Sequence, residues 1–225
     1  MNENARSQIL NGIRRSLHRG ELAEAARQTV QARLATPPHG PAIARAALPK
    51  AERVALFCQW AEFNSATVAR VAAAEVASEV TAYLARNNLP AEAAMAPSPQ
   101  LERYDWAGQA MLSLRRGVGR ASDQVSITGA FAGIAETGTL VMASGPDHPV
   151  TLNLLPDTHI VVLNEADIVG GYEEVWVMLR QRYGKDGMPR TVNTITGPSR
   201  TADIEQTIEL GAHGPRRLHI VVVGE

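Results

Sequence analysis

His159-Ile160-Val161-Val162-Leu163 is an unbroken aliphatic run that begins with a histidine, and it decides the fold class. A strand with aliphatic side chains on both faces is typical of a sheet that is covered on both sides. A second run of the same kind occupies residues 218–223. Segments with helical spacing alternate with such runs along the chain. This alternation predicts an α/β fold built on a largely parallel sheet.

Outward from this strand, the spacing of apolar residues predicts the other elements of the fold. Helices are expected at residues 50–62, 74–86, 172–183 and 203–210. Strands are expected at residues 66–71, 93–96, 125–129, 139–143, 159–163, 191–196 and 218–223. Residues 97–119 give no clear pattern, although Tyr104 and Trp106 within them indicate packing.

The N-terminal region has a different character from the rest of the chain. Residues 2–18 and 21–34 show narrow apolar stripes at helical spacing, with arginines on the remaining faces. The segment Thr36-Pro37-Pro38-His39-Gly40-Pro41 blocks both helix and central strand because of its prolines. We therefore predict a helical arm over residues 1–36, a proline-rich linker over 37–48 and an α/β domain over 49–225.

Composition limits the classes of function. The chain has 225 residues, of which 45% are hydrophobic, which is enough for one full core. Its net charge of −1 gives no overall field for nucleic acid. Cys58 is the only cysteine, so the chain itself can hold neither an internal disulfide nor a cysteine-ligated iron–sulfur cluster. No apolar run approaches the ~20 residues of a membrane span, and no secretory signal is recognisable, so we expect a cytoplasmic protein.

The first chemical motif is Gly133-Ile134-Ala135-Glu136-Thr137-Gly138-Thr139, between two predicted strands. It places one carboxylate, Glu136, on a tight turn. Gly138 permits a positive φ or a close backbone approach, and the two threonines add hydroxyl groups. Two roles are open for Glu136: a carboxylate that faces a ligand, or an acceptor of backbone N–H bonds that only ties the turn.

The second motif, Gly197-Pro198-Ser199-Arg200-Thr201, follows the strand at 191–196 and precedes the helix predicted at 203–210. Ligands of open α/β sheets bind outside the carboxyl ends of the strands, and helix N-termini there favour anions. Asp203 is expected to cap this helix. Arg200 is either a clamp for a carboxylate or phosphate, or a solvated arginine.

The third motif is Gly211-Ala212-His213-Gly214-Pro215-Arg216. His213 is either an acid–base group that works near neutral pH or ordinary polar surface. Together with His148, His159, Glu136 and Asp203 it fits no metal-ligand spacing, so no metal is predicted. The chain also lacks a Walker loop and a Gly-x-Gly-x-x-Gly motif, which argues against nucleotide binding of those two kinds.

Taken together, these motifs and the segment Leu154-Leu155-Pro156-Asp157-Thr158-His159 resemble the LUD domain, specifically the lactate utilisation protein C (LutC/YkgG) family. The resemblance covers roughly the second half of the chain. It implies a Rossmann-like fold with a small added subdomain, similar to the NagB/RpiA sugar-phosphate isomerases, CoA transferases and formyltetrahydrofolate cyclo-ligases.

The same resemblance implies a role in bacterial growth on L-lactate, which is oxidised to pyruvate with two iron–sulfur partner proteins. The clusters would reside in those partners, so this chain is expected to carry no cofactor and to act as a non-redox subunit that binds a small anionic ligand. No nucleic acid and no membrane span are expected. We assign Glu136 and His213 as catalytic. The predicted ligand-binding residues are Thr137, Gly138, Thr139, Gly197, Ser199, Arg200, Thr201 and Arg216.

We expect Glu136, Thr137, Arg200 and His213 to converge on one pocket at the carboxyl ends of the strands. Two other functions stay open. The chain could be a stand-alone enzyme of the CoA-transferase or cyclo-ligase kind that uses Glu136, an analogy that rests on the fold alone. It could also be a purely structural adaptor.

Overall fold

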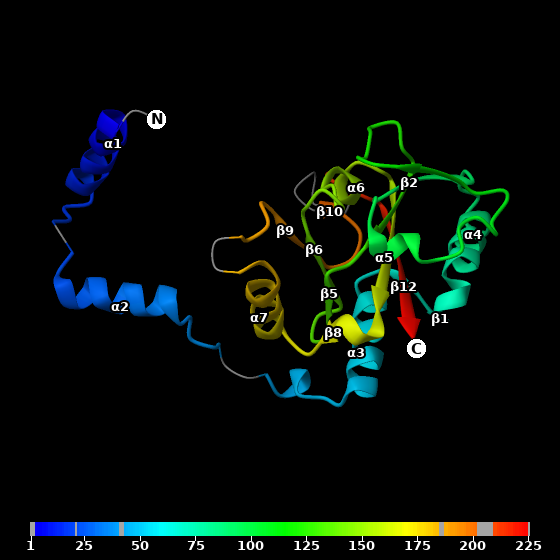
Figure 1. Ribbon diagram of the computed structural model, residues 1–225, viewed down its shortest axis with the longest axis horizontal. Coiled ribbons are helices and arrows are strands. Elements are labelled where there is room, and N and C mark those ends of the chain that lie inside the picture. The colour runs from blue at the N-terminus through cyan, green and yellow to red at the C-terminus, as the bar shows by residue number, and fades with distance from the viewer. Residues whose placement is uncertain (1–2, 21, 41–42, 185–186, 202–208, 225) are drawn as a thin grey trace. The chain divides into compact units, whose positions relative to one another are not determined.

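The computed structural model describes residues 3–20, 22–40, 43–184, 187–201 and 209–224. The chain divides into two compact units, residues 1–41 and residues 42–225. The first unit contains α1 (Glu3–Ser16) and α2 (Glu24–Ala35), which confirms the two predicted helices (Figure 1). No described side chain of either helix is buried. These helices therefore have no core of their own.

The second unit is organised around a parallel sheet. In the described residues its strand order is β1 (Thr67–Ala72), β12 (Arg217–Gly224), β7 (Thr158–Asn164), β4 (Val125–Gly129), β2 (Glu92–Met95) and β3 (Ser113–Arg116). Each neighbouring pair runs parallel. The α/β class and the largely parallel sheet are thereby confirmed. The aliphatic run of residues 159–163 lies within β7, which has a strand on each side.

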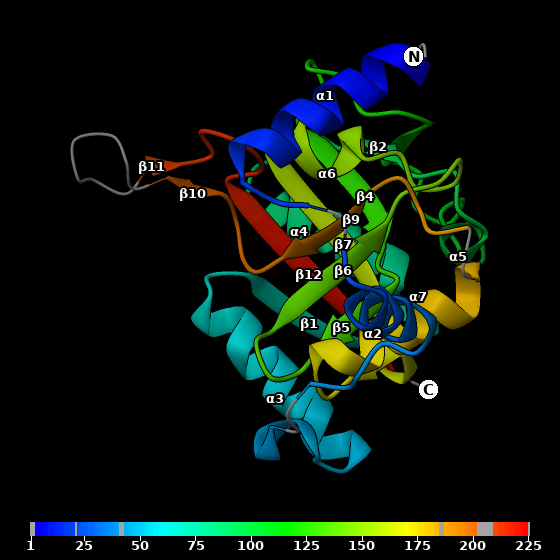
Figure 2. The same ribbon diagram turned by 90° about the vertical axis from the view of Figure 1, so that its left-hand side faces the viewer.

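A second, smaller sheet lies across one face of the first (Figure 2). Its order is β8 (Ile168–Val169), β5 (Ala132–Ile134), β6 (Thr139–Ala143) and β9 (Val192–Ile195). β6 pairs antiparallel with both β5 and β9, whereas β5 pairs parallel with β8. The sequence pattern predicted the longer of these strands but did not separate them from the parallel sheet.

A short antiparallel ribbon, β10 (Arg200–Thr201) and β11 (Glu209–Leu210), carries the second motif. The helix predicted at 203–210 is wrong for residues 209 and 210, because their backbone pairs with β10 instead of closing helical turns. The remaining part of that prediction, including the Asp203 cap, falls on residues 202–208, which lie outside the described residues.

Among the described residues, three apolar clusters fill the spaces between the layers. On one face of the main sheet, Ile160 and Val162 pack with side chains of α4 (Val76–Arg86). On the other face, Val161 and Leu163 pack with α3 (Lys50–Phe63) and with the second sheet. The second sheet is covered in turn by α7 (Tyr172–Tyr183), as its burial of Val175 and Leu179 shows. Successive side chains of β7 thus point to opposite faces of the sheet and pack into two different apolar clusters.

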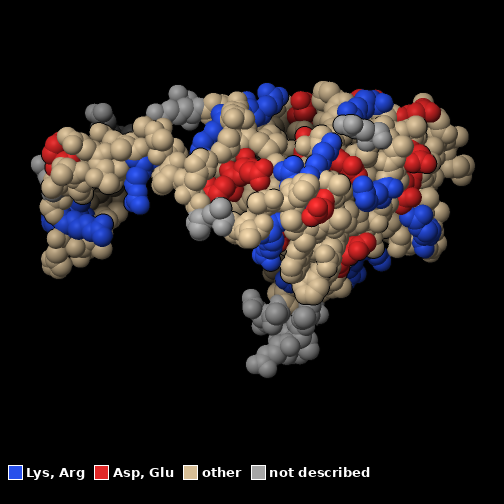
Figure 3. All heavy atoms as spheres, turned by 90° about the horizontal axis from the view of Figure 1, so that it is seen from below, with Lys and Arg blue, Asp and Glu red and all other residues tan. Residues whose placement is uncertain are grey.

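Short elements complete the unit: η1 (Ala44–Ala46), η2 (Ala73–Glu75), α5 (Pro99–Glu102), α6 (Thr151–Leu154) and η3 (Glu165–Asp167). The segment without a clear sequence pattern contains α5 and the edge strand β3. In it, Trp106 Nε1 donates to the Leu101 carbonyl at 2.7 Å, which confirms the packing role expected of this residue. Positive and negative side chains are interspersed on the face shown in Figure 3. Within the described ranges, no helix is both long and apolar enough to cross a bilayer.

Candidate functional site

Glu136 lies on the turn between β5 and β6, and it is only 4% exposed. Its backbone N–H donates to the Gly170 carbonyl at 3.1 Å. Its Oε1 accepts the N–H of Tyr172, the first residue of α7, at 3.2 Å, so the carboxylate lies at the positive end of that helix. Its Oε2 is buried and has no hydrogen-bond partner. Glu136 therefore ties the turn to α7 and keeps one carboxylate oxygen uncommitted.

Two glycines of the motifs are required by close backbone contacts. Gly138 has φ of 65°, and a Cβ there would overlap the backbone of Trp60 and Ala61 in α3. Gly197 has φ of 79°, and its Cβ would overlap the Asn64 carbonyl oxygen. Both loops are therefore pressed against the C-terminal end of α3, where a side chain larger than hydrogen does not fit.

The threonines of the first motif form a cluster of hydroxyl groups. Thr139, which is fully buried, has its Oγ1 at 2.7 Å from Thr137 Oγ1 and at 2.7 Å from Thr196 Oγ1. The Tyr172 hydroxyl is 3.3 Å away. The Thr137 carbonyl also accepts from Asn64 Nδ2 at 3.1 Å. Each of these hydroxyls has a protein partner, so the cluster joins β6 and β9 and fixes the turn.

Arg200 lies on β10, and its guanidinium is bound by protein acceptors. It donates to the Asn64 carbonyl and, at 2.7 Å, to Ser65 Oγ. Asn64 is the C-cap of α3, so the guanidinium lies at the negative end of that helix, where a cation is favourable. Thr201 belongs to the same strand and pairs with Glu209.

A cavity of about 200 Å³ lies between the second and third motifs. Gly197 and Ser199 line it from one loop and His213 from the other. The two loops are joined because Ser199 N donates to the Pro215 carbonyl at 2.8 Å and Gly211 N donates to the Ser199 carbonyl at 3.0 Å. Arg216 does not line the cavity; it donates to the Leu210 carbonyl at 3.4 Å.

The cavity lies at the opposite end of the main sheet from the predicted pocket. His159 and Leu218, the second residues of β7 and β12, belong to its lining, so it lies at the amino ends of the main strands. The pocket predicted at their carboxyl ends was to hold Glu136, Thr137, Arg200 and His213; of these, His213 lines this cavity at the amino ends instead. The reason is that the strand leading into the second motif, β9, belongs to the smaller sheet, where it runs antiparallel to β6.

His159 is a cavity residue that the site prediction did not include. Its side chain is 1% exposed, and its Nε2 lies 2.7 Å from Thr128 Oγ1. Its Nδ1 is buried without a partner. Burial lowers the pKa of this imidazole from 6.5 to about 3, so the ring is neutral at physiological pH. The signal in the sequence was a histidine that opens an otherwise aliphatic strand.

The structure brings together only some of the predicted residues. Thr139 and Thr196 connect the Glu136 turn to the cavity through adjacent hydroxyls. Among the described residues, no hydrogen bond or ion pair joins Glu136 to Arg200 or His213, and their convergence stays a prediction. Within the same part of the chain, no group of three or more His, Cys, Asp or Glu is placed to hold a metal ion.

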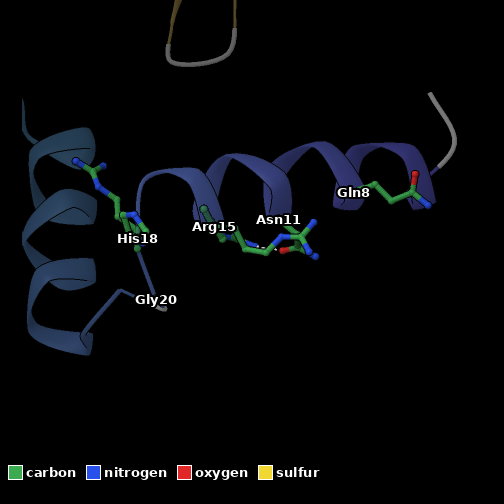
Figure 4. Close-up of a pocket in the computed structure, with 7 residues that line it drawn as sticks. Gln8, Asn11, Arg15, His18 and Gly20 are labelled. Atoms are coloured by element: carbon green, nitrogen blue, oxygen red, sulfur yellow. Dashed lines mark hydrogen bonds between the residues drawn. The ribbon is translucent and has the colours of Figure 1, made fainter.

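The N-terminal unit has an open hollow of its own along α1 (Figure 4). Its lining is strongly basic and contains Gln8, Asn11, Arg14, Arg15, His18, Arg19 and Gly20. Arg14 donates to Asn11 Oδ1 at 2.9 Å. The apolar side chains of Ile9 and Ile13 are exposed on the same helix.

The sequence profile of the LUD domain matches residues 57–223. The chain belongs to the LUD domain family. This match extends the resemblance noted in the second half of the chain to nearly the whole second unit. A crystal structure of a DUF162 family protein from Deinococcus radiodurans is similar in fold, with a TM-score of 0.59 and 27% identity. The similarity covers 79% of this chain and 99% of that one.

Curated relatives match over shorter stretches. An uncharacterised protein of Neisseria meningitidis serogroup B is 40% identical over 96 residues, which is 43% of this chain and 40% of that protein. The lactate utilization protein C of Geobacillus kaustophilus is 33% identical over 106 residues, which is 46% of this chain and 44% of that protein. The chain thus matches less than half the length of these two relatives.

Proposed function

We propose that the chain serves L-lactate utilisation, the oxidation of L-lactate to pyruvate, as a non-redox subunit in the cytoplasm. The observation that carries the proposal is the similarity of this LUD domain to proteins named lactate utilization protein C, such as that of Geobacillus kaustophilus. On this hypothesis the subunit works with two iron–sulfur partner proteins and binds a small anionic ligand.

The chemistry of the 200 Å³ cavity supports a small anion. Hydroxyl, amide and imidazole groups line it, and no Asp or Glu is among its described lining residues. Its polar side chains are those of Asn153, His159, Thr194, Thr196, Ser199 and His213. Donors without a competing carboxylate suit a carboxylate ligand, and the volume lies below the roughly 300 Å³ at which drug-sized pockets begin. A 2-hydroxy or 2-oxo monocarboxylate fits both properties.

The redox step is assigned to partners because the sequence offers no group to carry it. Oxidation of a 2-hydroxy acid needs an acceptor of a hydride or electrons, which proteins supply through a cofactor. A single cysteine cannot ligate an iron–sulfur cluster, and burial raises the pKa of the Cys58 thiol. The dinucleotide glycine motif is also missing from the sequence.

The N-terminal unit is the proposed docking element for the partners. Residues 1–41 contain six Arg and three Glu, a net charge of +3, although the whole chain carries −1. The basic hollow lies along α1 (Figure 4). The apolar side chains of Ile9 and Ile13 on this helix are exposed, so they are not buried in a core. An isolated helix of this length is marginal in water, so an acidic surface with an apolar groove on a partner would stabilise it.

The test is a dye-reduction assay with L-lactate. The purified chain alone is expected to give no turnover, and activity is expected when both iron–sulfur proteins are added. A variant lacking residues 1–35 should bind the partners weakly and lose most of the activity of the mixture. Lactate oxidation by the isolated chain would refute the subunit hypothesis, whereas full activity of the truncated mixture would refute docking through the arm.

The stand-alone enzyme remains the alternative, and the burial of Glu136 counts against it. A nucleophilic carboxylate must reach its substrate, but this side chain is 4% exposed and does not line the 200 Å³ cavity. Glu136→Gln keeps the shape of the side chain and an acceptor for Tyr172 N–H. Incubation with acyl-CoA and lactate, or with ATP and formyltetrahydrofolate, should give no product with either protein. Product formation that the substitution abolishes would favour the enzyme.

A further inference from the structure

A larger cavity, of about 560 Å³, lies at the opposite, carboxyl end of the main sheet. Gly129 ends β4 there, and Gln100 comes from α5, the helix that follows β2. The end of β6 with the loop that follows it (residues 143–148) and the C-terminal part of α7 form other walls. None of the predicted site residues lines it.

The strand order explains why a hollow forms at this place. β2 lies between β3 and β4. The chain passes from β2 to the edge strand β3 and then returns to the opposite side of β2 to form β4. At such a change of direction, the connections after neighbouring strands diverge and leave a crevice outside their carboxyl ends. Gly129 lets the Gln100 side chain lie directly against the end of β4, because a Cβ there would overlap it.

Two side chains in this cavity have unused hydrogen-bonding groups. His148 Nδ1 is buried without a partner, while its Nε2 is 3.4 Å from the buried Ser98 Oγ. Arg182, on α7, makes no hydrogen bond or ion pair with any described residue. Its guanidinium carbon lies 5.8 Å from the centre of the Tyr183 ring, within the reach of about 6 Å for a cation–π contact. A guanidinium at a cavity wall that no described carboxylate pairs with is suited to an anion.

The wall next to Arg182 is apolar and partly aromatic. Phe131, Met178 and Tyr183 contribute to it. The rings of Phe131 and Tyr183 lie 6.2 Å apart at an interplanar angle of 35°. Two carboxylates also belong to the lining: Asp147 is exposed, and Asp167 accepts from Asn164 Nδ2 at 2.8 Å. They disfavour a ligand with several negative charges.

We propose that this cavity binds an aromatic monoanion, a ligand with a planar ring system and a single carboxylate or sulfonate. The rings lie against Phe131, Met178 and Tyr183, the anionic group pairs with Arg182, and His148 supplies one hydrogen bond through Nδ1. The site is separate from the cavity of Ser199 and His213, so it does not depend on the proposed role in lactate utilisation.

The test uses two fluorescent probes with the same ring systems on the full chain. 1-Anilinonaphthalene-8-sulfonate carries the anion, and N-phenyl-1-naphthylamine does not. Arg182→Met should weaken binding of the sulfonate at least tenfold and leave the uncharged probe unchanged. Phe131→Ala should weaken both probes. Arg180→Met, on the same helix but outside the cavity, and Ser199→Ala, in the smaller cavity, are the matched controls and should bind as the wild type does.

The expected stoichiometry of the sulfonate is one per chain, measured by titration calorimetry. Equal affinity of Arg182→Met and Arg180→Met for the sulfonate would overturn the proposal. Unchanged binding of both probes to Phe131→Ala would overturn it as well, provided that circular dichroism shows this variant to be folded. A loss of fold in Phe131→Ala leaves the comparison of the two arginine variants to decide.

Discussion

The predicted motifs at the amino end of the main sheet and the larger cavity at its carboxyl end use polar side chains differently. At the amino end, Thr137, Thr139 and Arg200 are hydrogen-bonded to other parts of the protein, although Glu136 Oε2 and His159 Nδ1 are buried without a partner. At the carboxyl end, His148 Nδ1 and the Arg182 guanidinium have no such partner among the described residues. The difference teaches that a motif rich in glycine and hydroxyl residues can have a structural role. Side chains outside any motif can instead have hydrogen-bonding groups that no described protein group satisfies.

The largest expected effect comes from replacing a glycine at the tightly built end. Gly138→Ala forces a positive φ on alanine and drives its Cβ into the backbone of α3. Strain of ~1–2 kcal/mol and overpacking of ~1–3 kcal/mol together predict a loss of about 2–5 kcal/mol of unfolding free energy. Urea denaturation followed by circular dichroism measures it.

The matched control is Gly145→Ala, beside the open cavity at the other end. A Cβ at Gly145 meets no atom within 4 Å, so its stability should change little. Equal losses in the two variants would contradict the contrast between a tight and an open end.

The next effect is a pH dependence that originates in buried imidazoles near the amino end. Burial lowers the pKa of His159 to about 3 and that of His219 to about 4. In the unfolded chain each imidazole takes up a proton near pH 6.5, but in the folded chain it does so only near pH 3 or 4. The unfolding free energy therefore falls as the pH drops from 6.5 toward the pKa values of the folded state. Each histidine is expected to cost about 2 kcal/mol of unfolding free energy at pH 5.

Denaturation at pH 7 and pH 5 measures the sum of these losses, and NMR titration of the imidazole signals assigns them. His159 and His219 should stay neutral throughout this range. His148, whose pKa burial lowers against the opposing charge of Asp147, provides the comparison at the carboxyl end. A midpoint near 6.5 for His159 would show that its ring is accessible to water and would remove it from the buried set.

The smallest effect separates the two arginines. Arg200→Met removes bonds to the C-terminal end of α3 and should cost about 1 kcal/mol, or roughly 2–4 °C in the melting temperature. Arg182→Met breaks no hydrogen bond with described residues and should leave the melting temperature unchanged. If Arg200 instead serves a ligand, its replacement will lower anion affinity while the melting temperature stays constant.

The fold was more predictable than the site. Apolar runs such as residues 159–163 and 218–223 identified central strands, because burial on both faces leaves a local signature. The helix predicted at 203–210 failed at residues 209 and 210, because pairing with Arg200 and Thr201 is a tertiary contact that local propensity does not contain. The pocket at the carboxyl ends was misplaced for a related reason. The residues of the second motif do not indicate that the strand before it, β9, pairs with β6 in a second sheet.

The unassigned cavity was harder still to anticipate. Gln100 comes from α5, His148 from the loop after β6 and Arg182 from α7, and none stands in one of the three motifs. Only the order of the strands brings them together. Side chains whose role depends on topology in this way give no signal of their own in a single sequence.

The position of β12 has a consequence for how the molecule is made. β12 lies between β1 and β7, and Thr67 and Leu218 are 151 residues apart in sequence although their atoms are in contact. At about 5–20 residues per second, a ribosome needs roughly 8–30 s to produce the intervening chain. Throughout that time the edge of β1 that pairs with β12 has no neighbour. β7 is made within the same interval, and its edge toward β12 is open only from then on. The nascent chain is therefore expected to be a client of molecular chaperones until residues 217–224 emerge and close the sheet.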